Sequence, residues 1–221
     1  FESRWIGVME TEGKDFLVDF DLNQADQIPR VLHRAQDFAG YATLSPDGTQ
    51  LAWIEWQYPH MPWDASQLWW GRFDEMGRIA EKKLLAGNLS PTLPASSVFQ
   101  PIWLPSGELL VSEDSSGWWN LMVLENKIHV DNDPLWRRIW AMEAETALPQ
   151  WVYGMSTTAA AGKKIISACC QQGHWRIKLL TLNGLISEFE QPFNDLSGLH
   201  AYNNRVVAIA SNSLKEPGLL E

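Results

Sequence analysis

Short runs of alternating hydrophobic and polar residues follow one another along the whole chain, separated by segments rich in glycine, proline and asparagine. A period of two residues is typical of β-strands with one buried face. The clearest turn is Pro46-Asp47-Gly48, between the runs 41–44 and 51–56. Proline fixes φ, aspartate bonds its own backbone, and glycine accepts a positive φ. This stretch therefore predicts a β-hairpin.

The same order of strands and turns returns several times. Related turns lie at Gly107, Gly162 and Asn203-Asn204, each between two apolar runs. Repeats of roughly 40 to 50 residues with four strands each indicate a β-propeller, in which small antiparallel sheets stack as blades. A β-sandwich also has many short strands, but it does not predict a turn at the same place in every repeat.

The pattern places the blades at residues 4–35, 40–87, 99–132, 150–190 and 196–213. The first has three evident strands and the last has two, so we expect an all-β partial propeller of about four to five blades. Either flanking sequence is missing, or the open blade edges pair between molecules. The last strand of the third blade is expected at 127–130, and the first strand of the fourth at 152–159.

One helix is expected between the third and fourth blades. Asp133 can cap it and Pro134 suits its first position. Leu135, Ile139 and Met142 would share one face of a helix that ends at Ala144.

Composition narrows the possible partners and compartments. The chain has 221 residues, of which 45% are hydrophobic, and a net charge of -10, because acidic residues outnumber basic ones 27 to 17. This charge argues against a nucleic-acid-binding surface. No apolar run is long enough for a membrane helix, and the N-terminus lacks a signal-peptide pattern. The adjacent Cys169 and Cys170 are poorly placed to bond each other and suit a reducing compartment. We expect a soluble, cytoplasmic protein.

Catalytic and metal-binding patterns are not evident. Gly154-Met155-Ser156-Thr157-Thr158 comes nearest to a nucleophile elbow but lacks its second glycine. Cys169, Cys170 and His174 lack a fourth metal ligand. We therefore expect no catalytic residue, no metal and no cofactor in this chain.

Loops rich in tryptophan are the candidate binding sites, because recognition in such folds is carried by loops. Aromatic faces beside a few polar groups suit peptides or small molecules, although many of these rings could instead pack between blades. The candidate residues are Met61, Trp63, Asp64, Trp118, Trp119, Asn120, Trp151 and Tyr153.

The turn and the loops together resemble a known family. Ser45-Pro46-Asp47-Gly48 and the tryptophan-rich segments after it are similar to the N-terminal propeller of bacterial acylaminoacyl-peptidases and dipeptidyl-aminopeptidase-like enzymes of the prolyl oligopeptidase family. The matching segments occur in the same order, at 44–56, 60–64, 67–69, 97–103, 114–121 and 149–156. Leu104-Pro105-Ser106-Gly107 departs from the usual turn, and Trp136 to Trp140 has no evident match.

The resemblance implies a non-catalytic propeller of a serine peptidase that gates access to the active site and lines the cavity for short peptides. The catalytic Ser, Asp and His of that family would belong to an α/β-hydrolase domain after Glu221, and they have no counterpart in this chain. The expected partners are short peptide substrates and that hydrolase domain, not nucleic acid or membrane. The alternative is a stand-alone TolB-like or WD40-like propeller that binds proteins or peptides.

Overall fold

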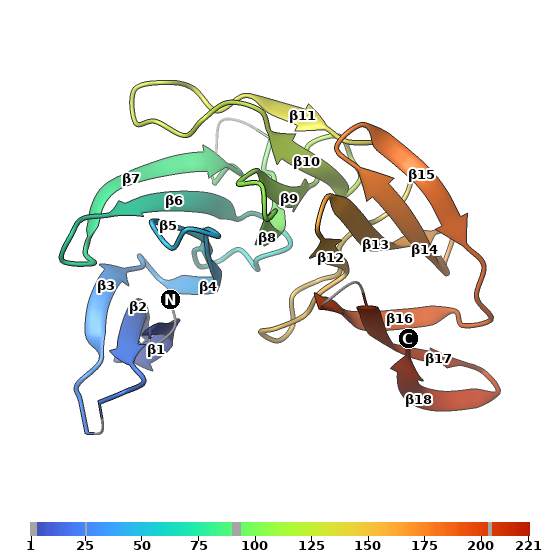
Figure 1. Ribbon diagram of the computed structural model, residues 1–221, viewed down its shortest axis with the longest axis horizontal. Helices are drawn as coiled ribbons and strands as arrows, with labels where there is room; N and C mark the ends of the chain where they lie inside the picture. The colour runs from blue at the N-terminus through green and yellow to red at the C-terminus, as the bar shows by residue number, and fades with distance from the viewer. Residues whose placement is uncertain (1–3, 25, 90–93, 203–204) are drawn as a thin grey trace. The chain divides into compact units, whose positions relative to one another are not determined.

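The protein is an all-β chain in a computed structural model that describes residues 4–24, 26–89, 94–202 and 205–221. Within these residues, 18 strands form five antiparallel sheets of three or four strands, each built from strands that are consecutive in sequence (Figure 1). The chain divides into two compact units, Phe1–Pro101 with Ile128–Pro134, and Ile102–Lys127 with Leu135–Glu221.

The first unit contains two sheets. The three-stranded sheet has the order β1-β2-β3, and the four-stranded sheet has the order β4-β5-β6-β7. Their bounds are β1 Arg4–Thr11, β2 Lys14–Asp21, β3 Arg30–Arg34, β4 Phe38–Leu44, β5 Gln50–Trp56, β6 Gln67–Phe73 and β7 Ile79–Ala86.

The hairpin predicted at Pro46-Asp47-Gly48 is confirmed as the β4–β5 turn. The Gly48 amide donates to the Ser45 carbonyl at 2.8 Å, and Gly48 has a φ of 68°. Asp47 Oδ1 accepts bonds from the Ser45 hydroxyl at 2.6 Å and from the Thr49 amide at 3.1 Å. These bonds to the charged carboxylate hold the pKa of Asp47 below its usual value, the Ser45 bond contributing most.

The core of the first unit joins its two sheets. Leu17 of β2 and Leu51 and Trp53 of β5 are fully buried in one cluster. The Trp53 indole donates to Glu55 Oε1 at 2.7 Å, and His33 Nε2 lies 2.7 Å from the same oxygen. The buried carboxylate therefore has partners from both sheets, as buried charge requires.

The second unit contains three sheets, ordered β11-β10-β9-β8, β12-β13-β14-β15 and β16-β17-β18. The strand β8 spans the boundary between the units, because its residues 98–101 belong to the first unit and its residues 102–103 to the second. The bounds are β8 Val98–Trp103, β9 Leu109–Glu113, β10 Asn120–Leu124, β11 Trp136–Arg138, β12 Thr158–Ala161, β13 Lys164–Gln171, β14 His174–Thr181, β15 Gly184–Phe189, β16 Asp195–Tyr202, β17 Arg205–Asn212 and β18 Lys215–Leu220.

Apolar clusters between neighbouring sheets hold the second unit together. Leu110 and Leu121 of one sheet pack with Ile165 and Leu180 of the next. A second cluster joins Ile166 and Leu199 across the following pair of sheets. The inner strands β9 and β13 are thus buried along most of their length, which is how stacked blades exclude water.

The helix expected between the third and fourth blades is wrong. Its first part is instead β11, which pairs with β10 through Leu124 opposite Trp136 and Met122 opposite Arg138. Ile139 is buried against the neighbouring strands, and its amide donates to the Leu121 carbonyl at 2.9 Å. Residues 127–130, expected as that strand, form none.

Two other strand boundaries also differ. The first strand of the fourth sheet is Thr158–Ala161, so residues 152–157 precede it rather than belong to it. The fifth sheet has a third strand, Lys215–Leu220, where two were expected. The turn predicted at Asn203-Asn204 lies outside the described residues.

Candidate functional site

All the predicted site residues lie at an equivalent edge of their own sheets, namely the edge formed by the ends of the strands. In an antiparallel sheet of four consecutive strands, the turn between the second and third strands and the connection leaving the fourth share one edge. The β5–β6 loop carries Met61, Trp63 and Asp64; the β9–β10 segment carries Trp118, Trp119 and Asn120; and the β11–β12 connection carries Trp151 and Tyr153. Strand order alone thus brings each group to a comparable place in its sheet.

The β5–β6 loop is closed by its own hydrogen bonds. Asp64 Oδ2 accepts the Met61 amide at 3.0 Å, and the Asp64 amide donates to the Met61 carbonyl at 2.9 Å. The Ser97 hydroxyl donates to the Pro62 carbonyl. Met61 and Asp64 are exposed, whereas Trp63 is half-buried. The loop therefore presents a thioether and a carboxylate on a short, fixed turn.

The β9–β10 group is divided between core and surface. Asn120 is buried, and its amide donates to the Met142 and Ala144 carbonyls at 3.1 and 3.2 Å and accepts the Met142 amide at 2.8 Å. Trp119 is half-buried, whereas Trp118 is 39% exposed. Asn120 thus anchors the segment that presents Trp118.

The β11–β12 connection carries the most exposed aromatic residues of the predicted set. Trp151 is 71% and Tyr153 is 58% exposed. Gln150 just before them is buried, and neither polar atom of its side chain has a hydrogen-bond partner within the described structure. That these eight residues bind a ligand stays a prediction.

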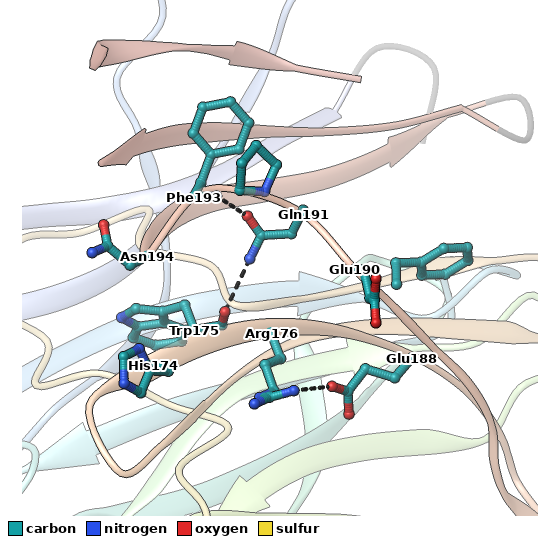
Figure 2. Close-up of a pocket in the computed structure, with 10 residues that line it drawn as sticks. His174, Trp175, Arg176, Glu188, Glu190, Gln191, Phe193 and Asn194 are labelled. Carbon is teal, nitrogen blue, oxygen red and sulfur yellow. Dashed lines mark hydrogen bonds and ion pairs between the residues drawn. The ribbon is translucent and has the colours of Figure 1, made fainter. Parts of the chain in front are cut away.

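Sequence reasoning missed a pocket of about 410 Å³ at the same kind of edge, in the β12–β15 sheet. It lies where β14 begins, where β15 ends and along the connection to β16 (Figure 2). Its walls include His174, Trp175, Arg176, Glu188, Glu190 and Phe193. The signal available in the sequence was the dense polar and aromatic segment 188–194, but only folding brings it against β14.

Gln191 holds the connection against β14. Its side-chain amide donates to the Trp175 carbonyl at 2.9 Å and accepts the Phe193 amide at 2.5 Å (Figure 2). The connection is also tied to the β17–β18 turn, because Asn212 Nδ2 donates to the Pro192 carbonyl at 2.9 Å. Because both polar atoms of its side chain are hydrogen-bonded within the protein, Gln191 fixes the position of the connection that forms one wall of the pocket.

Of the two carboxylates that line the pocket, Glu188 has charged partners and Glu190 has none within the described structure. Glu188 accepts Arg176 Nη1 and Lys178 Nζ at 2.6 Å each, and Lys178 is buried behind it. These bonds, with Lys178 first, hold the pKa of Glu188 below its usual value. Glu190 is exposed and has no hydrogen bond or ion pair to any described residue.

The buried Cys169 thiol is not suited to nucleophilic chemistry. Burial raises the pKa of Cys169 to about 11, so its thiol is a poor nucleophile. Among the residues described, no group of three His, Cys, Asp or Glu side chains is placed to hold a metal ion.

No described helix has the length and apolar character needed to cross a bilayer.

Several solved structures match the chain over most of its length. Puromycin hydrolase matches 93% of this chain with 27% sequence identity and a TM-score of 0.81. A puromycin-hydrolyzing peptidase of Mycobacterium tuberculosis matches 98% with 22% identity and a TM-score of 0.80. Prolyl oligopeptidase B from Galerina marginata matches 98% with 10% identity and a TM-score of 0.71. The chain is structurally similar to the propeller region of these peptidases.

This similarity confirms the resemblance inferred from the tryptophan-rich loops and the fold class of a partial β-propeller. The chain spans about a third of the length of the peptidases, 31% of puromycin hydrolase and 33% of the mycobacterial enzyme. No protein-family model matches the chain, and no curated protein sequence does.

A TolB-type propeller is a more distant match. The putative TolB of Agrobacterium tumefaciens matches 84% of this chain with 13% identity and a TM-score of 0.58, and the match covers 60% of the TolB chain. At this identity the likeness shows the fold alone.

Proposed function

We propose that this chain is the non-catalytic propeller of a prolyl-oligopeptidase-family serine peptidase, restricting access to the active site by size and lining the substrate cavity for short peptides. The structural match to puromycin hydrolase over nearly the whole chain carries this proposal. In this proposal the catalytic Ser, Asp and His belong to another part of the protein, since residues 1–221 have no Gly-x-Ser-x-Gly motif.

The exposed aromatic residues support the substrate-lining role. Trp118, Trp151 and Tyr153 in the second unit lie at the same kind of sheet edge, on segments outside the strands. Rigid rings beside polar groups bind peptides at little entropic cost.

The substrates to test first are aminoacyl and acylaminoacyl amides, since two of the matched proteins hydrolyse puromycin according to their names. The full-length protein that carries this chain is assayed on chromogenic aminoacyl and acylaminoacyl peptides, with and without a serine-directed inhibitor. We expect inhibitor-sensitive turnover. Absence of serine-dependent turnover on every substrate would overturn the proposal.

The gating role is tested with a series of peptides of increasing length. We expect turnover to fall as length increases, and Trp151→Ala and Tyr153→Ala to change KM or the length limit more than kcat. Tyr202→Ala is the matched control, because Tyr202 is 80% exposed but ends β16, at the opposite edge of its sheet. Equal effects of all three variants would contradict a role for the Trp151 edge.

A stand-alone propeller that binds proteins or peptides is the second candidate, since the match covers 60% of the putative TolB chain but only 31% of puromycin hydrolase. The reading frame after Glu221 distinguishes the two. Several hundred further residues with a Gly-x-Ser-x-Gly motif favour the peptidase, and an early stop codon favours the binding module.

We also propose that the chain self-associates when expressed alone and that the full-length protein is cytoplasmic. The sheets containing β1 and β18 have three strands each, so residues 1–221 expressed alone should self-associate through blade edges. A monomer in light scattering would contradict this.

The cytoplasmic location is tested by fractionating cells and probing for the full-length protein.

A further inference from the structure

The Glu190 pocket, defined by the residues of β14, β15 and the β15–β16 connection described above, has a fixed frame. The Gln191 bonds to Trp175 and Phe193 hold its two sides together, and the Asn212 bond to Pro192 holds the connection from outside. A binding site needs such a preformed frame, since ordering a loose loop would oppose binding.

Glu190 supplies the one lining carboxylate that has no partner within the described structure. Glu188 is engaged at both oxygens by Arg176 and Lys178. The Glu190 carboxylate projects from the β15–β16 connection, as Figure 2 shows. A cation entering the pocket would therefore meet a carboxylate that is not already neutralised.

Aromatic rings provide the second element of recognition. Trp175 and Phe193 are half-buried and Phe189 is exposed, all three lining the pocket. The Lys215 ammonium already lies 5.7 Å from the centre of the Phe193 ring. Rings of this kind pack against the methylene stem of a basic side chain and attract its charge.

The net charge of the whole chain also favours a cationic ligand. With a net charge of -10, the protein attracts cationic ligands and repels anionic ones over distances of about a Debye length. Arg176 and Lys178 share the single negative charge of Glu188, so these three side chains together carry a charge of +1, and the attraction for a cation comes from Glu190 and from the charge of the whole chain.

We infer that the Glu190 pocket is a subsite for a lysine or arginine side chain of a peptide, with Glu190 pairing its charge and the rings packing against its stem. The inference rests on the proposed function only in taking a peptide as the ligand. It is made for this pocket and does not depend on where peptide bonds are cut.

Binding is measured by ligand-observed NMR titration on the full-length protein, treated with a serine-directed inhibitor so that no peptide is consumed. The probes are N-acetyl-Ala-Lys-Ala-amide and N-acetyl-Ala-norleucine-Ala-amide, whose blocked ends leave the lysine ammonium as the only difference in charge. We expect the lysine peptide to bind more tightly, and its affinity alone to fall as salt is added.

Glu190→Gln should weaken binding of the lysine peptide about three- to fivefold, the range of an exposed ion pair, and leave the norleucine peptide unchanged. Glu216→Gln is the matched control, since the exposed carboxylate of Glu216 makes no hydrogen bond or ion pair to any described residue and lies outside the pocket. It should change neither affinity.

Equal affinity for the two peptides, or an unchanged lysine affinity in Glu190→Gln, would overturn the inference. These outcomes are separable from failure of the proposed function. Serine-dependent turnover without lysine selectivity refutes only the subsite, whereas lysine selectivity without turnover refutes only the peptidase assignment.

Discussion

The side-chain carboxylate of Glu145 accepts a hydrogen bond from the backbone amide of Trp119, with 2.9 Å between Oε2 and N. The backbone of the same residue pairs with Cys170 through two bonds of 2.8 Å. Glu145 therefore joins the β9–β10 segment of one sheet to β13 of the next. This link fixes the base of the segment on which Trp118 is exposed.

Replacing Glu145 tests that link. We expect Glu145→Ala to lower the free energy of unfolding by about 1–2 kcal/mol, because the Trp119 amide loses a charged acceptor. Glu145→Gln keeps an acceptor oxygen and should cost less. Urea unfolding of the two variants, with hydrogen exchange at the Trp119 amide, measures both effects. Unchanged exchange at Trp119 in Glu145→Ala would show that the bond does not order the segment.

The hairpin at Pro46-Asp47-Gly48 could be predicted because its causes are local. The Ser45, Asp47 and Thr49 groups that bond one another lie within five residues, so the sequence itself contains the interaction. The shared edge of the candidate residues was equally accessible, since it follows from strand order alone.

The β11 strand could not be predicted in the same way. Asp133 and Pro134 are real helix-start signals, but they were outweighed by pairing with β10, where Trp136 lies opposite Leu124. That pairing depends on a distant strand, and tertiary contacts override weak local preference. The Glu190 pocket escaped prediction for the same reason, because the Gln191 bond to Trp175 spans 16 residues.

Two glycines with similar backbone strain but different surroundings allow a paired test. Gly87 and Gly107 have φ values of 85° and 99°. A Cβ on Gly87 would lie 1.9 Å from the Ser66 carbonyl oxygen, whereas one on Gly107 would have no atom within 4 Å. Gly107→Ala should cost about 1–2 kcal/mol from the left-handed backbone alone.

Gly87→Ala should cost several kcal/mol more, because the Ser66 backbone must also move. Thermal and urea unfolding of both variants give the comparison. Equal destabilisation would mean that Gly87, just after β7, and Ser66 of the β5–β6 loop do not approach as closely as the structure places them.

The two cysteines should differ in reactivity. Cys169 is buried with a pKa of about 11, so about one thiol in a thousand is ionised at pH 8. Burial also raises the pKa of Cys170, but that residue is only partly buried. We expect a thiol reagent to label Cys170 slowly in the folded protein and Cys169 only after unfolding. Cys170→Ser should therefore nearly abolish labelling under native conditions, and rapid labelling of that variant would contradict the burial of Cys169.

Asp19 should make the free energy of unfolding of the first unit depend on pH. Its carboxylate is bonded by Arg30 at 2.7 and 2.9 Å and by Arg4 at 2.5 Å. Burial alone would raise the pKa of Asp19, but the bonds from Arg30 and Arg4 outweigh it and hold the pKa below its usual value. Since the unfolded chain then takes up the proton at a higher pH than the folded one, the stabilisation is present at neutral pH. It is lost as pH falls from about 5 through the pKa of the folded state.

Asp19→Asn should lower the free energy of unfolding at pH 7 by roughly 1–3 kcal/mol and flatten its decline below pH 5. Glu216→Gln controls for the change in net charge, because it removes an exposed carboxylate from the other unit. Urea unfolding of the three proteins between pH 2.5 and 7 makes the measurement. Parallel pH profiles for wild type and Asp19→Asn would show that Arg4 and Arg30 do not hold the carboxylate in its charged form, and the acid sensitivity would then have to come from another carboxylate.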